Sequence, residues 1–418
     1  MLYFDDLGSS VRTARTKWSA MLRSSPTIAA INSRPWKEWL GRPYSIAFRL
    51  AWRNITRDQV RLVIAVVGVA FAVLLMTLQM GLLIGFATTS SSLIDRAKAD
   101  LWIAPRGAKD VDQAGQIPER QKFLALGTQG VTSVESLIVR FAVWKRPDGG
   151  AESVIIVGID PSAGVLQPWN FVAGTPATIG LPEIVIDKLY SRKLGVTQIG
   201  QTVEIMGRRA RVVGFTSGIR TFTQSPYVFT SLSTARTLSG VPDEWTTYFL
   251  VRAERGANLS RIRTALQLAL PSTDVWTSKG FSWQTRVYWL LTTGAGSALL
   301  LAAVLGLVVG LVIVSQTLYS ATVERQEEYA TIRAMGASDR YLKSIILQQA
   351  LVSGALGYIL GTAAALVIAW IAQGGSAALL LSYQLILALG VVTLTMCVAA
   401  SLLSIRKVLS VDAASVFR

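Results

Sequence analysis

Four long apolar runs decide what this chain can fold into. Each run is free of Asp, Glu, Lys and Arg, and each exceeds the roughly 20 residues that a helix needs to cross a bilayer. A mean hydropathy of +0.44 and a charged fraction of 16% agree with a membrane protein that also carries a polar domain. We therefore predict an α-helical membrane protein with four transmembrane helices, at residues 62–87, 287–316, 344–371 and 379–405.

The charges that flank these runs predict the topology. Arg61 precedes the first run, and Arg406 and Lys407 follow the last one, so the positive-inside rule places both termini in the cytoplasm. Residues 373–377 form a short uncharged loop, which suits the outer side of the membrane. The net charge is +16, but the Lys and Arg residues are not gathered into one basic domain with aromatic platforms, and many of them lie near membrane ends. We therefore expect the lipid bilayer, and no nucleic acid, as a partner.

Two segments precede the first predicted span. Residues 1–45 are polar and mixed in charge, which favours a cytoplasmic tail over an amphipathic helix on the membrane surface. Residues 46–61 are predicted as an amphipathic helix on the inner leaflet, although a solvated basic face on an ordinary helix is the alternative. Its basic face consists of four arginines spaced four residues apart, Arg49, Arg53, Arg57 and Arg61. At the other end, residues 406–418 are predicted as a cytoplasmic tail.

Residues 88–286 differ from the runs around them because charges of both signs return. Short β-rich segments at 137–143, 153–157, 183–186 and 227–229, together with a hairpin that turns at Gly207, predict strands. A helix is expected after Asn258, at residues 259–270. We predict a mixed α/β extracytoplasmic domain inserted between the first and second transmembrane helices.

Several kinds of chemistry have no sequence basis. The chain has no histidine, a single cysteine (Cys397) and no Gly-Lys pair that could form a phosphate-binding Walker A loop. The predicted spans also lack the ionisable residues with which ion-coupled transporters bind their driving ion. We therefore predict that the chain is not an enzyme, binds no metal and no cofactor of its own, and takes energy from a partner.

Small and polar residues within the spans suggest helix contacts. Three Gly-x-x-x-Gly pairs allow close helix approach, either within the chain or in a dimer, namely Gly81/Gly85, Gly306/Gly310 and Gly357/Gly361. Gln79 lies near the outer half of the first span. We consider two roles for Gln79, a hydrogen bond between helices and a contact with substrate.

Charge returns abruptly at residues 317–343, between the second and third predicted spans. Charged residues here alternate with small and apolar ones, as in a helix that lies in a groove on a partner protein. Gly336 is expected to end this helix and turn the chain toward the third span. An anchor at the inner membrane face is the alternative. The predicted contact residues are Glu324, Arg325, Glu328, Ile332, Arg333, Ala334, Met335 and Gly336.

The same segment carries a family resemblance. From Glu324 to Ser338 it reads ER-x-x-E-x-x-x-I-R-A-M-G-A-S, which resembles the motif after the second span in MacB/FtsX-type ABC transporter permeases. The order of spans, LAWRN at 50–54, GID at 158–160 and the ending VDAASVFR are also similar to that family. The first span, beginning RLVIAVVGVAFA, looks most like the DevC-like branch, whose members lack a fused ATPase.

The resemblance implies partners and a location. It implies two permease chains, a separate ABC ATPase subunit that binds ATP and Mg, a periplasmic membrane-fusion adaptor, an outer-membrane duct, and a place in the bacterial inner membrane. The implied function is mechanotransmission during export of a lipid, peptide or hydrophobic substrate. An FtsX-like subunit that activates a periplasmic partner such as a cell-wall hydrolase, and a membrane scaffold without a motor, are the alternatives.

Overall fold

The computed structural model describes residues 59–113, 115–375 and 378–409. The predicted tail at 1–45, the arginines Arg49, Arg53 and Arg57, and the chain from residue 410 onward lie outside the described residues. Arg61 falls in the first described helix, but its side chain is likewise outside the description.

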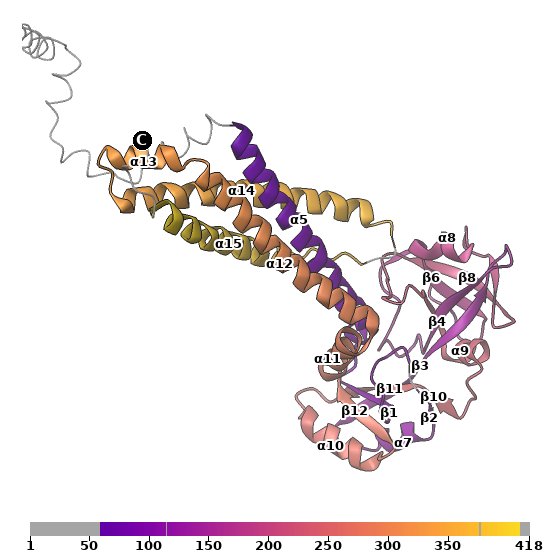
Figure 1. The fold of residues 1–418 in the computed structure, drawn as a ribbon. Coiled ribbons are helices and arrows are strands. Elements are labelled where there is room, and N and C mark those ends of the chain that lie inside the picture. The colour runs from indigo at the N-terminus through magenta and orange to yellow at the C-terminus, as the bar shows by residue number, and fades with distance from the viewer. Residues whose placement is uncertain (1–58, 114, 376–377, 410–418) are drawn as a thin grey trace, which may run out of the picture. The chain divides into compact units, whose positions relative to one another are not determined.

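Four of the described helices are long and apolar enough to cross a membrane, which confirms the predicted fold class. The sheet-bearing domain follows the first of them, also as predicted. These helices, visible as the long ribbons in Figure 1, are α5 (Gln59–Ser90), α12 (Gly294–Val323), α14 (Asp339–Ala372) and α15 (Tyr383–Leu409).

The second span differs most from its predicted bounds. The sequence predicted a helix from residue 287, but α12 begins at Gly294. Before it, α11 (Ser278–Val287) runs into a π-helical turn, η2 (Tyr288–Thr292), and the backbone is extended at Thr293. Trp289 in this turn is buried against Phe222, with ring centroids 4.0 Å apart. The turn reads YWLLT, and its apolar residues make the run in the sequence look longer than the helix.

The extracytoplasmic domain is built on one ten-stranded mixed sheet in the order β12-β1-β11-β3-β4-β9-β6-β8-β5, with β7 pairing β3 and β8; β10 pairs β2 separately. The strands are β1 (Leu101–Pro105), β2 (Ile117–Pro118), β3 (Val131–Lys145), β4 (Ala151–Ile159), β5 (Phe171–Gly174), β6 (Glu183–Asp187), β7 (Thr202–Ile205), β8 (Arg208–Thr216), β9 (Tyr227–Ser231), β10 (Trp245–Thr246), β11 (Tyr248–Ala253) and β12 (Thr273–Thr277).

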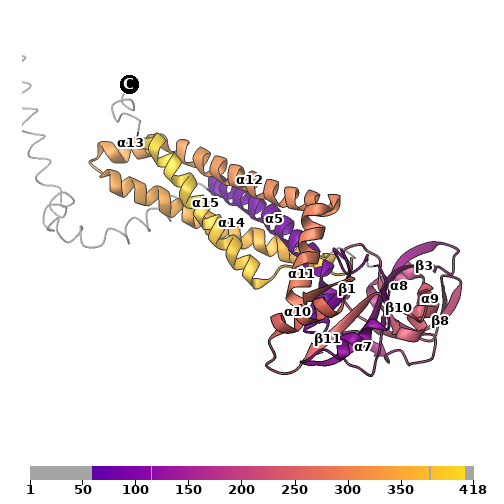
Figure 2. The ribbon, with the colours of Figure 1, turned by 90° about the horizontal axis from the view of Figure 1, so that it is seen from below.

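Short helices cover this sheet. Helix α9 (Leu232–Ser239) lies against β3 and β4, and α10 (Leu259–Ala269) lies along β12 (Figure 1). Figure 2 shows α9 beside β3 from below. The predicted helix after Asn258 is confirmed, since Asn258 Oδ1 accepts hydrogen bonds from the first backbone amides of α10. The remaining helices are α6 (Ser92–Arg96), α7 (Gln121–Leu126), η1 (Lys188–Tyr190) and α8 (Ser191–Leu194).

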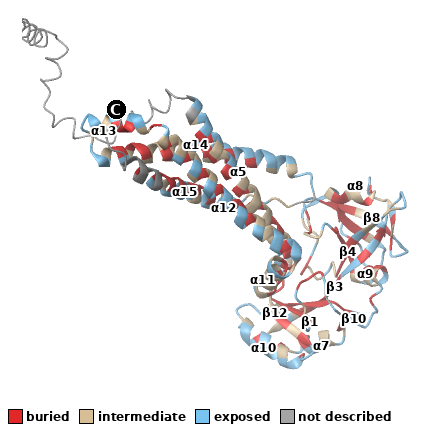
Figure 3. Ribbon diagram, in the orientation of Figure 1, coloured by how far each residue is buried: buried red, intermediate tan, exposed pale blue. Residues whose placement is uncertain are grey.

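The predicted strands are confirmed, and so is the hairpin. In the pair β7–β8, Ile205 faces Arg208, so Met206 and Gly207 form a two-residue turn. Both residues have positive φ, 50° and 75°, as in a type I′ turn, whose backbone matches the right-handed twist of the paired strands. The strands β1, β6 and β9 are buried almost throughout. Figure 3 shows buried segments in red within the sheet domain. Burial on both faces explains why β1, which reads LWIAP, is a continuous apolar run.

One carboxyl group lies deep in this core. Asp112 is 2% exposed, and its Oδ1 accepts a hydrogen bond from the hydroxyl of Tyr227 at 3.1 Å. Burial, with the nearby Asp110 carboxyl as a second cause, raises the pKa of Asp112 to about 7. This group therefore changes charge near neutral pH.

The described chain forms two compact units, and the division passes through all four long helices. One unit contains residues up to Val67, Ser315–Leu356 and the chain from Leu394. The other contains Gly68–Val314 and Gly357–Thr393, and so holds the whole extracytoplasmic domain.

Candidate coupling site

A short helix, α13 (Gln326–Ala334), separates α12 from α14. Helix α12 ends at Val323, and the backbone of Arg325 (φ −100°, ψ 12°) leaves the helical region before α13 begins. Glu327 and Glu328 in the first turn and Arg333 in the last turn favour the helix because they complement its dipole. The predicted segment 317–343 is therefore three helical pieces, of which α13 is the middle one.

Gly336 turns the chain after α13, as the sequence predicted. Its φ is +97°, a conformation that residues with a side chain rarely adopt. The Gly336 amide donates to the carbonyl of Arg333, and the Ala337 amide donates to the carbonyl of Ile332. This pair of bonds is a Schellman motif, which satisfies carbonyl groups left open at a helix end.

The inner face of α13 is fixed by Tyr329, a residue that sequence reasoning missed. Its side chain is 1% exposed and packs in a cluster with Leu342, Ile345, Ile346 and Ile405. The Tyr329 hydroxyl donates a 2.7 Å hydrogen bond to Oε1 of Gln349, and burial raises the pKa of Tyr329 to about 12. In the sequence, an aromatic residue within a charged segment was the available sign that one face of this helix packs inward.

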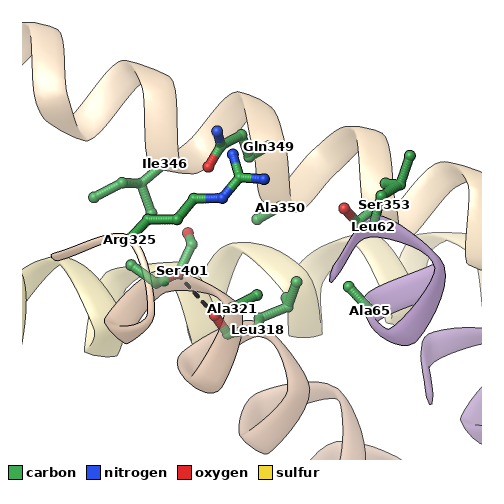
Figure 4. A pocket seen from close by; sticks show the side chains of 11 residues that line it. Leu62, Ala65, Leu318, Ala321, Arg325, Ile346, Gln349, Ala350, Ser353 and Ser401 are labelled. Atoms are coloured by element: carbon green, nitrogen blue, oxygen red, sulfur yellow. Dashed lines mark hydrogen bonds between the residues drawn. The ribbon is translucent and has the colours of Figure 1, made fainter. Parts of the chain in front are cut away.

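The side chain of Arg325, just before α13, is also buried. It is 7% exposed and extends toward the amide of Gln349 at a cavity of about 40 Å³ (Figure 4). Thr322, Ser353 and Ser401 contribute hydroxyl groups to the wall. This volume holds a few water molecules. Arg325 is therefore buried at the joint between α12 and α13, and its predicted contact with an ATPase stays a prediction.

The outer face of α13 is a mixture of acidic and apolar side chains. Met335, at 75%, is among the most exposed large hydrophobic residues of the described chain. We call the following exposed residues the α13 outer face: Glu324, Glu327, Glu328, Thr331, Ala334 and Met335. Such a face, with one prominent apolar side chain among carboxylates, can bind a groove on another protein.

Arg333 links α13 to the start of α14. Its Nη2 lies 3.6 Å from Oδ1 of Asp339, and both side chains are partly exposed. Exposed pairs contribute little to stability, typically about 0–1 kcal/mol. Ile332, which is half-buried, packs against the cluster around Tyr329.

The glycines of the Gly-x-x-x-Gly pairs make contacts within the chain. A Cβ on Gly306 would lie 3.1 Å from the Gln79 side chain, and a Cβ on Gly310 would lie 2.8 Å from the Met76 side chain. A Cβ on Gly361 would lie 2.5 Å from the Ala70 carbonyl oxygen. Gly81 and Gly85 face residues 378–381, and Gly357 is buried. Intrachain packing accounts for the five glycines with these contacts, and a dimer role stays a prediction.

An apolar cavity of about 490 Å³ lies at the C-terminal end of α5 and the N-terminal end of α12, where both helices connect to the extracytoplasmic domain. Leu82 and Phe86 of α5, Ala298 and Leu299 of α12, and Phe222 form much of its wall. Gln79, for which a helix contact and a substrate contact were both considered, is half-buried and packs on α12, and it is not among the residues that line this cavity. The cavity is a place for an apolar group at the end of the membrane helices.

Comparison with known proteins gives two family matches in order along the chain. Residues 62–269 match the model of the MacB-like periplasmic core domain, and residues 284–413 match the FtsX-like permease C-terminal model. No curated protein matches the sequence.

Solved structures resemble only part of the chain. The periplasmic region of MacB from Actinobacillus actinomycetemcomitans is 14% identical, with a TM-score of 0.35 over 44% of this chain and 92% of that one. The extracellular domain of the noncanonic ABC-type transporter YknZ from Gram-positive bacteria is 16% identical, with a TM-score of 0.34 over 43% of this chain and 99% of that one.

Proposed function

The chain belongs to the MacB/FtsX-type permeases, the membrane components of ATP-binding cassette systems, and we propose that it transmits the motion of a separate ATPase to its extracytoplasmic domain. The chain is a multi-pass protein of the bacterial inner membrane. In the proposed topology both termini and α13 are cytoplasmic, and the sheet domain faces the periplasm.

The α13 outer face is the observation that carries this proposal. A docking helix must expose residues to a partner and yet be held firmly by its own chain. Exposed Glu324, Glu328 and Met335 meet the first condition, and the hydrogen bond from Tyr329 to Gln349 meets the second. A push on α13 would then displace α14 directly, because Gln349 belongs to α14.

The energy source in this proposal is a partner subunit. The sequence has no Walker A loop, so ATP and Mg would be bound by a separate ABC ATPase, as in the DevC-like branch. A second copy of this chain, a periplasmic adaptor and an outer-membrane duct complete the proposed assembly.

The proposed substrate is a lipid, a lipidated peptide or another hydrophobic molecule. The cavity of about 490 Å³ supports this choice because its wall is mostly apolar and is formed partly by α5 and α12. A pocket of this size suits an acyl chain or a drug-sized apolar group. Export from the outer leaflet would need no channel through the four helices.

ATP hydrolysis by the reconstituted complex tests the proposal. The purified chain alone is expected to hydrolyse no ATP, and the ATPase that copurifies with it is expected to be stimulated in lipid nanodiscs. Glu324→Lys should abolish that stimulation while the protein still inserts, and so should Arg333→Glu. Glu254→Lys, a charge reversal at an exposed site in the extracytoplasmic domain, is the matched control and should retain it. Full stimulation in both α13 variants would contradict the coupling role.

A further inference from the structure

Helix α14 has no direct covalent route to the sheet domain. Helices α5 and α12 each join that domain in sequence, through α6 and η2. Helix α14 is instead followed by a short connection to α15. If α13 moves α14, as the proposed function requires, a noncovalent contact must pass that motion to the extracytoplasmic domain.

The structure contains such a contact at Arg220. Its Nη2 donates a 2.6 Å hydrogen bond to the carbonyl oxygen of Gln373, and its Nε donates to the carbonyl oxygen of Gly375 at 3.3 Å. Gln373 directly follows Ala372, the last residue of α14, and Gly375 lies two residues further along the chain. A positive charge is favourable near the C-terminal end of a helix, and a planar guanidinium can donate to two carbonyl groups at once.

The residues beside Arg220 are anchored in the core of the domain. The amide of Ile219 donates a 2.7 Å hydrogen bond to Oδ2 of the buried Asp187, at the end of β6. The amide of Thr221 donates to the Tyr190 hydroxyl at 3.4 Å. Arg220 therefore sits between two residues fixed to the sheet domain, so force on its side chain reaches β6 directly.

The same loop also contacts the other membrane helices. The ring of Phe222 lies 5.3 Å from that of Phe86 in α5 and 4.0 Å from that of Trp289 in η2, which precedes α12. Residues 217–226, between β8 and β9, thus contact α5, the turn η2 that precedes α12, and the residues that follow α14. We call residues 217–226 the transmission loop.

We propose that the transmission loop is where the membrane helices act on the extracytoplasmic domain, and that Arg220 is the residue that joins it to α14. This inference rests on the proposed function. From Gln349 to Ala372, the last residue of α14, the helix rises about 35 Å at 1.5 Å per residue, and the Arg220 acceptors lie just beyond Ala372. Motion of α13 would be passed to α14 through Gln349, and from the end of α14 to the extracytoplasmic domain through Arg220.

Arg220→Gln and Arg252→Gln form a matched pair for the test. Arg252 also donates to two backbone carbonyls, those of Lys98 and Gly164, but both lie within the extracytoplasmic domain. The assay uses the full chain with its copurifying ATPase in nanodiscs. It measures ATP turnover, and hydrogen exchange of residues 217–231 with and without ATP plus vanadate.

The unaltered complex should show turnover and a nucleotide-dependent change in exchange. Arg220→Gln should keep turnover within about twofold but reduce the exchange change roughly tenfold, the factor expected for losing one charge-assisted hydrogen bond. Arg252→Gln should keep both. An unreduced exchange change in Arg220→Gln, or an equal loss in Arg252→Gln, would overturn the role of Arg220. Absence of turnover in the unaltered complex would contradict the proposed function itself.

Discussion

The hydrogen bond between Tyr329 and Gln349 offers a direct test of how α13 is held. Tyr329→Phe keeps the ring in its cluster of Leu342, Ile345, Ile346 and Ile405 and removes only the hydroxyl group. Nε2 of Gln349 has no hydrogen-bond partner among the described residues, so the variant would leave both ends of this amide unpaired. The lost bond and the unpaired buried acceptor together correspond to about 2 kcal/mol, or a roughly 30-fold change in an equilibrium.

Hydrogen exchange of α13 measures this change. Local opening of Gln326–Ala334 should become roughly 30-fold more frequent in Tyr329→Phe, and stimulation of the partner ATPase should fall with it. The double variant Tyr329→Phe/Gln349→Leu replaces both partners by apolar groups, so most of the protection should return. Unchanged exchange in Tyr329→Phe, or a double variant that opens more often than the single one, would refute the reasoning.

Three further predictions concern backbone geometry, helix packing and pH. Gly336→Ala should destabilise the turn after α13 by about 1–2 kcal/mol, because φ at this position is +97°, whereas Gly294→Ala, in open space, should have little effect on thermal unfolding. Gly85→Val should lower the unfolding temperature in detergent, because a Cβ there would lie 1.8 Å from the Ala378 carbonyl oxygen and overpacking costs about 1–3 kcal/mol. Because the pKa of Asp112 is raised from 3.8 to about 7, its contribution to stability is complete below pH 3.8 and is lost as the pH rises through 7. Asp112→Asn should therefore stabilise the protein at pH 8 by up to roughly 4 kcal/mol and change it little near pH 4; equal effects at both pH values would contradict the burial of this carboxyl.

The membrane helices were the most predictable part of the fold. Uncharged length alone identified all four, because no other structure satisfies backbone groups in so apolar a run. The start of α12 could not be predicted, since Tyr288–Thr292 are as apolar as a span. Their irregular turn depends on Trp289 packing against Phe222, which is distant in sequence.

Many of the strands and helices of the extracytoplasmic domain were predicted, but of the strand pairings only that of the β7–β8 hairpin was. Local alternation identified β3, β4 and the β7–β8 hairpin. Strands β1, β11 and β12 were not predicted. Each has only five or six residues, and β1 pairs with two strands that lie far along the chain. Such long-range partners leave no pattern within a short window.

The candidate site was predicted as a segment, but its two faces were not. An arginine in a charged segment is normally exposed, so nothing local indicated that Arg325 is buried. The break between α12 and α13 turns it inward toward Gln349, and only the tertiary structure contains that break. Gly336 was predictable because helix ends with glycine have a local cause.

Site-specific photocrosslinking at Met335 tests the central claim most directly. A photoreactive amino acid in place of Met335 should crosslink, in membranes, to a protein that mass spectrometry identifies as an ABC ATPase, because this side chain is 75% exposed on the α13 outer face. The matched control is Leu268 of α10, which is 79% exposed in the extracytoplasmic domain and should give no such product. An ATPase product at Met335 alone is the predicted result. No ATPase product at Met335, or equal products at both positions, would contradict the claim that α13 receives the motion of a separate ATPase.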